Sequence, residues 1–196
     1  MQKKIFYFFS LFFLLFFIVL FRLYFPTTIS GDTALPMKPT ESQMIVDTWQ
    51  LYSTEDFAIL LPGIPQHISE KMPFNNGKEL IKYDMYLVQQ AVGSTFMVSV
   101  IRYPESYDTS DSRKILESVT NEMLSNNSEN HLVSSKIGEY FGKPSMDNVI
   151  ANPSLHVVMK AVLSNKTLFV FTVVDSIEDR AKEHFEKSMK EFRLLP

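Results

Sequence analysis

One continuous apolar stretch near the N-terminus constrains this 196-residue chain more than any other feature of its sequence. Between Ile5 and Phe21 only Ser10 is polar. As a helix rising about 1.5 Å per residue, the stretch is roughly 25 Å long, and it exceeds about 30 Å if it continues to Phe25. It is apolar on every side, which argues against a core helix of a soluble domain. The sequence therefore predicts a transmembrane segment at residues 5–25.

The charges around this segment predict its orientation. Lys3 and Lys4 precede the apolar run, whereas only Arg22 lies on its far side before Lys38. Because positively charged flanks tend to stay in the cytoplasm, we expect a cytoplasmic N-terminus and an extracytoplasmic C-terminal part. The lipid bilayer is then the first expected partner, through residues 5–25.

Two fates are open for residues 1–26. As a signal anchor, the segment stays in the membrane as a single span. As a signal peptide, it is cut near Ser30, where small residues precede Gly31, and the protein becomes secreted or periplasmic. The apolar core is long for a signal peptide, which favours the anchor.

Composition narrows the possible chemistry. The chain has no cysteine, which excludes disulfides, thiolate metal sites, a cysteine nucleophile and a lipid-modified N-terminal cysteine. The formal charge is −3, and it is more negative still after residue 26, because Lys3, Lys4 and Arg22 all precede that point. That balance argues against nucleic acid as a partner and against electrostatic docking onto anionic lipid.

The remaining chain divides into a tether and one domain. Residues 27–43 are rich in Pro, Ser and Thr without apolar periodicity, which predicts a flexible tether, and residues 44–196 are long enough for a single domain with a full core. Seven runs of this domain are rich in β-branched and aromatic residues and end at turn residues. They are Ile45–Tyr52, Phe57–Leu61, Ile81–Gln89, Phe96–Tyr103, Leu132–Ile137, Leu155–Leu163 and Thr167–Val174.

The last two runs predict a hairpin, and two further segments predict helices. Asn165-Lys166 separates the runs as a tight turn would, and the run that follows is apolar on both faces, as in a central strand. Apolar residues recur at helical spacing in Ser110–Asn126 and Glu178–Lys190. Ser176 with Asp179 predicts a capping box for the second helix.

No catalytic, cofactor-binding or metal-binding residue is predicted. The four histidines, His67, His131, His156 and His184, lie in no metal-ligand spacing. The sequence contains no nucleophile elbow, phosphate-binding loop or dinucleotide fingerprint. We therefore interpret each histidine as an ordinary surface or half-buried residue and expect no cofactor.

Three acidic clusters have a structural explanation. They lie at Glu55-Asp56, at residues 105–111, and at Asp175 with Glu178 and Asp179. Oxygen ligands of this kind could hold a hard cation weakly, but none of the clusters has the spacing of a calcium loop. The second and third precede predicted helices, where carboxylates act as caps, so capping is favoured over metal binding.

A binding patch formed by aromatic side chains is an open alternative. Alternation assigns most of them to core or sheet-face packing, while a few could form a groove for a ligand or partner. The candidates are Trp49, Tyr52, Tyr83, Tyr86, Tyr103, Tyr107 and Tyr140.

The order of these elements resembles the PsbP/Mog1-like domain family. The opening FAILLPGIP at 57–65 is similar to the family's first strand and Pro-Gly turn, and FMVSVIRYP at 96–104 resembles the strand that precedes its helix. The turn at Gly138 and Gly142, the hairpin around Asn165, and the ending from Phe185 to Phe192 follow in the family's order. The ending has two extra residues before its final Phe.

The resemblance implies an α+β fold with an antiparallel sheet of about six strands flanked by helices. It also implies a binding role, because family members serve as regulators, photosystem subunits, lipoproteins and chaperones and share no catalytic residues. From fold and sequence together we expect a membrane-tethered, extracytoplasmic, non-enzymatic binding or assembly domain with a protein partner. The alternatives are a hydrolase or metal-dependent enzyme with an unmarked site, and a structural subunit of a membrane complex.

Overall fold

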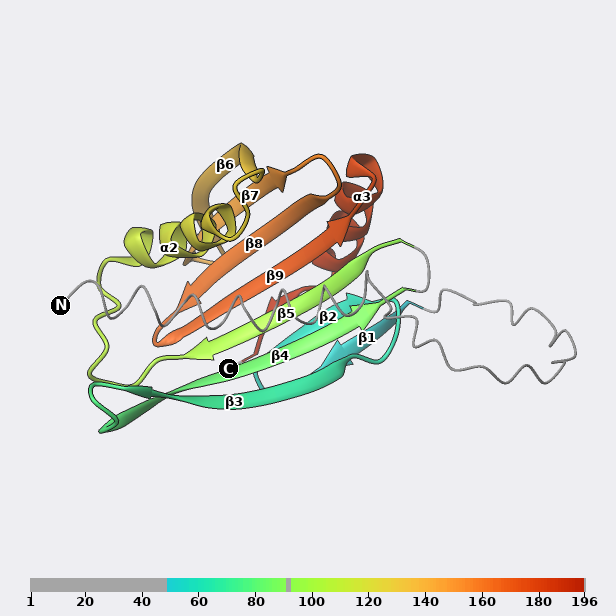
Figure 1. The fold of residues 1–196 in the computed structure, drawn as a ribbon. Coiled ribbons are helices and arrows are strands. Elements are labelled where there is room, and N and C mark those ends of the chain that lie inside the picture. Colours follow the sequence, from blue (N-terminus) through green and yellow to red (C-terminus); the bar gives the residue numbers. More distant parts are fainter. Residues whose placement is uncertain (1–48, 91–92, 196) are drawn as a thin grey trace, which may run out of the picture. The chain divides into compact units, whose positions relative to one another are not determined.

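The computed structural model describes residues 49–90 and 93–195. They form a mixed α+β domain with a seven-stranded and a three-stranded antiparallel sheet (Figure 1). The predicted transmembrane segment and the tether lie outside the described residues. Within the described ranges, no helix is long and apolar enough to cross a membrane.

The large sheet has the strand order β3-β4-β5-β9-β8-β7-β6, and the small sheet has the order β1-β2-β10. The elements, in chain order, are β1 (Gln50–Ser53), β2 (Phe57–Leu61), β3 (Gln66–Phe74), β4 (Glu79–Gln89), β5 (Thr95–Arg102), α2 (Ser112–Ser125), β6 (His131–Tyr140), β7 (Lys143–Ala151), β8 (His156–Ser164), β9 (Thr167–Asp175), α3 (Glu178–Met189) and β10 (Arg193–Leu194).

The predicted hairpin and central strand are confirmed. Ser164 pairs with Thr167 across the Asn165-Lys166 turn, and Asn165 has the positive φ of 54° that such a turn requires. The strand that follows, β9, is fourth of the seven strands and nearly all of it is buried. Its apolar residues on both faces are explained by cover on both sides.

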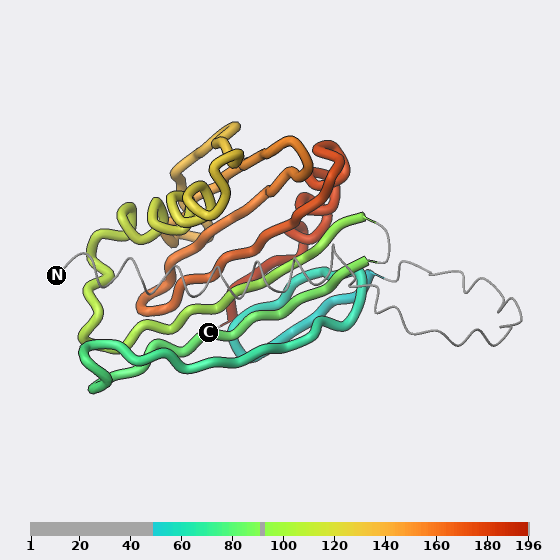
Figure 2. Tube along the Cα trace, in the orientation of Figure 1, coloured from blue at the N-terminus to red at the C-terminus, as the bar shows by residue number. Residues whose placement is uncertain are grey.

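Helix α2 covers one face of the large sheet, and helix α3 with the small sheet covers the other. On one face, α2 packs against β7 and β8, where Thr120 contacts Met146 and Asn148. On the other face, α3 and the small sheet enclose a core that includes Phe57, Phe171 and Ala181. Figure 2 shows α2 beside β7 and β8, toward one edge of the large sheet, and β1 and β2 beside β4 and β5, toward the other edge.

Three strands were not predicted from the sequence, and in each case the omission has a physical reason. In the edge strand β3, polar residues such as Ser, Glu and Lys lie between the apolar ones, and the strand contains Pro73. Strand β7 contains Pro144 and the buried Asn148. Asn148 is acceptable in the interior because its side-chain amide donates to Thr120 at 2.8 Å. β10 is too short to show a pattern. The expected sheet of about six strands is therefore a sheet of seven with a second, smaller sheet.

Both helices form where predicted, but only the first has the expected cap. Asp111 caps α2, because its carboxylate accepts the Lys114 backbone N–H at 3.0 Å. The capping box at the second helix is wrong: Ile177 is the N-cap of α3 and makes no side-chain cap bond. The Asp175 carboxylate accepts the Ile177 N–H at 2.8 Å instead, and the helix begins at Glu178, as predicted.

Candidate functional site

The four histidines lie on four different elements and have different surroundings. His67 is on β3 and His131 begins β6, while His156 is on β8 and His184 on α3. His156 Nδ1 lies 4.0 Å from the Glu178 carboxylate. Among the described residues, no group of three or more His, Asp or Glu side chains could hold a metal ion.

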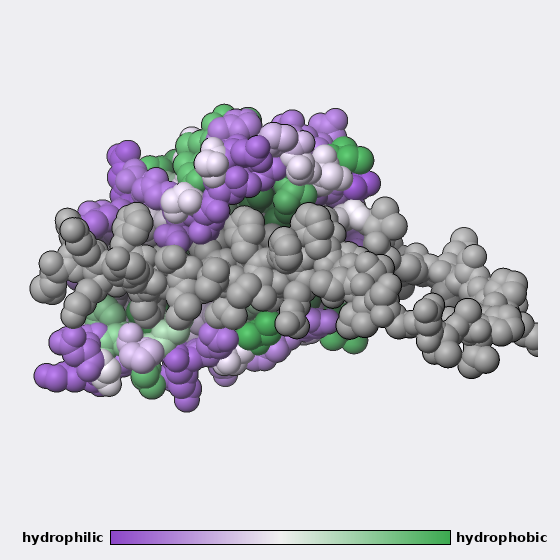
Figure 3. Space-filling model, in the orientation of Figure 1, coloured by the Kyte–Doolittle hydropathy of each residue, from purple (hydrophilic) through white to green (hydrophobic). Residues whose placement is uncertain are grey.

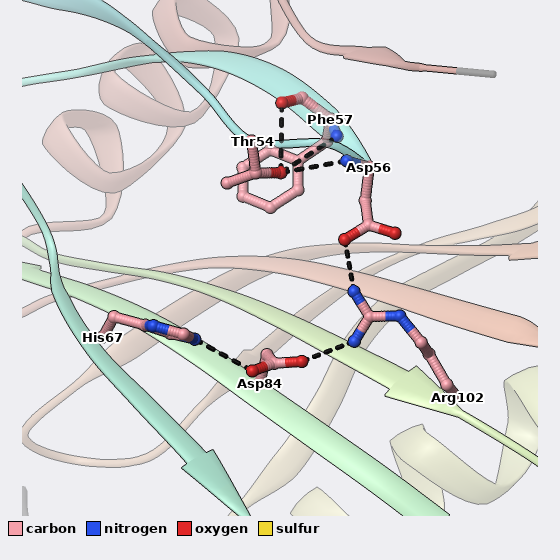
Figure 4. A network of polar contacts seen from close by, with 6 residues as sticks. All are labelled: Thr54, Asp56, Phe57, His67, Asp84 and Arg102. Atoms are coloured by element: carbon pink, nitrogen blue, oxygen red, sulfur yellow. Dashed lines mark hydrogen bonds and ion pairs between the residues drawn. The ribbon is translucent and has the colours of Figure 1, made fainter.

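One polar cluster joins the two sheets, and we call it the Arg102 cluster: Asp56, His67, Asp84 and Arg102 (Figure 4). The Arg102 guanidinium donates to Asp56 beside the small sheet and to Asp84 on β4. The other Asp84 oxygen lies 2.9 Å from His67 Nε2. Each anionic group thus has a cationic or hydrogen-bonding partner within the cluster, and its role is to hold the small sheet against the large one.

Local backbone structure presents Asp56 to this cluster. The Thr54 hydroxyl accepts the backbone N–H groups of Asp56 at 3.1 Å and of Phe57 at 3.2 Å, which shapes the turn between β1 and β2. The acidic cluster Glu55-Asp56 of the sequence is thereby divided: Asp56 joins the Arg102 cluster and Glu55 is exposed.

Electrostatics of the Arg102 cluster favour its charged state. Burial alone would raise the pKa of Asp84, but hydrogen bonds from Ser69, His67 and Arg102 outweigh it and hold that pKa below its usual value. Burial, with a smaller contribution from the Asp84 charge, raises the pKa of Tyr86 to about 12. The Tyr86 ring stacks on His67 with 4.4 Å between ring centroids, so both rings are held in place.

A second polar cluster lies where β5 begins and β9 ends, and we call it the Asp175 cluster: Ser94, Asp175, Arg180 and His184. Asp175 is fully buried and receives two hydrogen bonds from Arg180, each 2.7 Å long. The Ser94 hydroxyl donates to Asp175 at 2.5 Å and also contacts His184 Nδ1 at 2.8 Å. Burial would raise the pKa of Asp175, but the bonds from Arg180, Ser94 and Ile177 lower it.

The Asp175 cluster contains Ser, His and Asp but not in a catalytic order. In a hydrolase triad the histidine lies between the other two groups, takes the serine proton and is oriented by the carboxylate. Here Ser94 lies between, its hydrogen is directed to Asp175, and its side chain is buried. The arrangement can fasten β5, β9 and α3 together, and it does not prepare a nucleophile.

The aromatic candidates pack into the fold. The Trp49 ring meets Phe96 edge-on at 5.5 Å, and Lys187 Nζ lies 4.1 Å above it. Tyr103 is buried and stacks on Tyr107 at 4.2 Å. Tyr52 packs near Tyr86, Tyr83 is buried, and the Tyr140 hydroxyl donates to the Phe192 carbonyl. These contacts agree with the interpretation of most aromatics as packing.

An exposed sheet edge is the feature that sequence reasoning missed. From His131 to Glu139 every residue of β6 is exposed, and β7 is its only neighbouring strand in the described part of the chain. The edge carries large apolar side chains, Leu132, Val133 and Ile137, and the adjoining turn carries Phe141. In Figure 3, apolar residues (green) interrupt the hydrophilic surface near the end of the sheet where β6 lies.

Phe141 is the most unusual residue of this edge. Its side chain is 79% exposed, and its φ of +49° is one that bulky residues rarely adopt. With Gly142 at φ +71°, it forms the two-residue turn between β6 and β7, a position that favours Asn or Gly. The predicted turn is confirmed at Phe141 and Gly142, whereas Gly138 lies within β6 and pairs with Ser145. The Phe141 ring meets the Tyr140 ring edge-on, with 4.7 Å between ring centroids, and stays largely exposed. We call β6 with this turn, residues 131–142, the β6 edge.

Comparison with solved structures supports the fold. The domain is similar to the solution structure of cyanobacterial PsbP (CyanoP) from Synechocystis sp. PCC 6803, with a TM-score of 0.51 and 11% identity. The similarity covers 84% of this chain and 98% of that chain. At this identity the likeness concerns the fold, and it confirms the PsbP-like architecture expected from the sequence. No protein-family model and no curated protein matches the sequence.

Proposed function

We propose that this chain is a membrane-tethered, extracytoplasmic binding domain that holds a protein partner along the β6 edge and catalyses no reaction. The apolar segment at 5–25 would supply the tether, and the charge pattern around it supports an extracytoplasmic domain. The PsbP-like fold agrees with a binding role by analogy only. The observation that carries the proposal is the exposed β6 edge.

An open edge of this kind binds extended chains. Its outward backbone N–H and C=O groups can pair with another strand, and alternate side chains then give specificity. Proteins that avoid such pairing protect their edges with Lys, Pro or short strands. The opposite edge strand, β3, has Lys71 and Pro73, both exposed. β6 is ten residues long and contains no Pro, and beside the exposed Lys136 it carries three large exposed apolar side chains, Leu132, Val133 and Ile137.

The contact of Ser94 with His184 is the one specific observation that favours a hydrolase. It supports that alternative weakly, because Ser94 is buried and its hydroxyl hydrogen is directed to Asp175. In the Arg102 cluster the charges are likewise paired with one another, as structural networks are. Neither cluster offers an activated nucleophile or a general base to a substrate.

Site-specific photo-cross-linking tests the proposal. The photoreactive amino acid p-benzoylphenylalanine replaces Ile137 on β6 or, as a matched control, Ser69 on β3, and membranes containing the full chain are irradiated. Both positions are partly or fully exposed on edge strands of the same sheet. We expect a discrete adduct from position 137 and little or none from position 69. Equal yields from both positions, or no adduct from position 137, would contradict a binding role for the β6 edge.

A further inference from the structure

We propose that the partner at the β6 edge is a second copy of this chain, with the two β6 strands paired antiparallel about a two-fold axis at Ile137. This inference rests on the proposed function, because it identifies the partner of the same site. The pairing would join two seven-stranded sheets into one continuous sheet. Three features of β6 support it: the direction of its backbone groups, the position of its midpoint, and the pattern of its side chains.

The backbone groups that are available for pairing follow from the turn. Tyr140 and Lys143 close a two-residue hairpin and are paired across it, as residues that exchange both backbone hydrogen bonds are. Alternate residues from Tyr140 back to Ser134 then direct their N–H and C=O groups to β7. The residues between them, Ser135, Ile137 and Glu139, direct theirs away from the sheet.

The regular part of β6 selects the axis. A β-bulge lies between Leu132 and Ser134 and interrupts the ladder, and the turn begins after Tyr140. The regular part is therefore 134–140, and its midpoint is Ile137, an outward-directed residue. An axis at Ile137 pairs this whole part with itself and forms about six hydrogen bonds between the two copies. Any other axis shortens the ladder or runs it through the bulge.

Three of the four large exposed apolar residues of the β6 edge are symmetric about the same point. Val133, Ile137 and Phe141 stand four residues apart, so the axis places Ile137 opposite the partner's Ile137 and Val133 opposite the partner's Phe141. Opposed residues of an antiparallel pair lie close enough to remove each other's apolar surface from water. The exposed Phe141, which in the single chain meets the Tyr140 ring edge-on, would thereby gain a further packing contact.

Charge supports the same register. An axis at Lys136 would place that lysine opposite the partner's Lys136, and an axis at Glu139 would place that glutamate opposite the partner's Glu139, and like charges directly opposed are unfavourable. An axis at Gly138 would place Ile137 opposite the partner's Glu139, an apolar residue against a charge. With the axis at Ile137, Lys136 lies opposite the partner's Gly138 and Glu139 opposite the partner's Ser135, so no charges are opposed.

The expected dimer depends on concentration. Pairing of one seven-residue strand with another buries less surface than the roughly 1,200–2,000 Å² of standard stable complexes. We therefore expect a weak dimer in dilute detergent solution. Two copies tethered to one bilayer are confined to a small volume, which raises their effective concentration and favours pairing there.

Cysteine cross-linking tests the register, because the chain has no cysteine of its own. Single variants Ile137→Cys, Ser134→Cys and Ser69→Cys of the full chain are oxidised in membranes with copper phenanthroline. Only position 137 lies opposite itself, within the 4.4–6.8 Å Cα separation that a disulfide needs. Ser134 would lie about 20 Å from the partner's Ser134, six residues along the strand. Alkylation with a maleimide dye verifies that each thiol is accessible.

We expect the disulfide-linked fraction of Ile137→Cys to exceed that of each control by about fivefold or more. A yield at position 137 no greater than at position 69, or a maximum at position 134, would overturn the inference. The photo-cross-linking adduct separates this failure from failure of the proposed function. An adduct that contains a different protein would overturn the second copy as partner and leave the β6 edge as a binding site, whereas absence of any adduct would overturn both.

Discussion

The Asp175 cluster gives a quantitative prediction about stability. Asp175→Asn keeps the shape of the side chain and an oxygen that can accept the Ile177 N–H, but it removes the charge that pairs with Arg180. Removing one partner of a buried ion pair costs about 3–5 kcal/mol. Arg180 is one-third exposed and can recover water contacts, so we expect a loss of about 2 kcal/mol in the free energy of unfolding at neutral pH.

The sign of the pH dependence follows from the direction of the pKa shift. The pKa of Asp175 is lowered in the folded chain, so its contribution to stability is complete above the unfolded value of about 3.9 and is lost as pH falls through the folded pKa. The Asn variant has no such group to protonate. The difference in stability between wild type and Asp175→Asn should therefore be constant above about pH 4 and narrow below it.

Trp49 provides the signal for this experiment. It is the only tryptophan of the chain and lies beside His184, with 5.6 Å between ring centroids. Urea unfolding of the full chain in detergent micelles is followed by Trp fluorescence at pH 5 and pH 3. Both pH values lie below the range in which histidine ordinarily titrates, so histidines do not contribute to the difference. Lys182→Met, which removes only an exposed ion pair with Glu178, should cause no measurable loss. The reasoning would be refuted if wild type and Asp175→Asn had the same free energy of unfolding at pH 5, or if their difference were as large at pH 3 as at pH 5.

Four further substitutions test other parts of the structure. Ser135→Pro should abolish disulfide cross-linking of Ile137→Cys and leave thermal unfolding nearly unchanged, because the lost N–H points away from β7, whereas Gly138→Pro should lower the unfolding temperature by removing a β6–β7 bond. Asp111→Ala should cost about 1 kcal/mol in urea unfolding through loss of the α2 cap, with cross-linking unaffected. Phe171→Ala, in the core under α3, should cost about 3–5 kcal/mol; a loss below 1 kcal/mol would contradict the packing described.

Sequence patterns predicted those elements whose side chains follow a single rule. β2 and β9 are apolar runs that end at turn residues, and both were predicted within one residue of their bounds. Both helices were found from their apolar spacing. The α+β class was predictable for the same reason, since strands and helices of this kind must bury their apolar faces against one another.

The remaining features depend on contacts between distant segments. β7 contains the buried Asn148, whose side-chain amide donates to Thr120 of α2, and the local sequence pattern does not indicate such a partner. The Arg102 cluster joins residues of three strands and a turn, so its pairing could not be read from spacing. The run at 132–137 was predicted as a strand, but its place at the edge of the sheet follows from strand order, which the sequence does not display.

Hydrogen exchange along β6 tests the central claim most directly. The full chain is exchanged in native membranes and again after dilution to low concentration in detergent, and the peptide that covers residues 132–141 is compared by mass spectrometry. If the β6 edge is engaged in the membrane, the outward amides of Ser135, Ile137 and Glu139 should exchange more slowly there than in detergent, while the β3 peptide should not change. Equally fast exchange of the β6 peptide in both conditions would contradict the account.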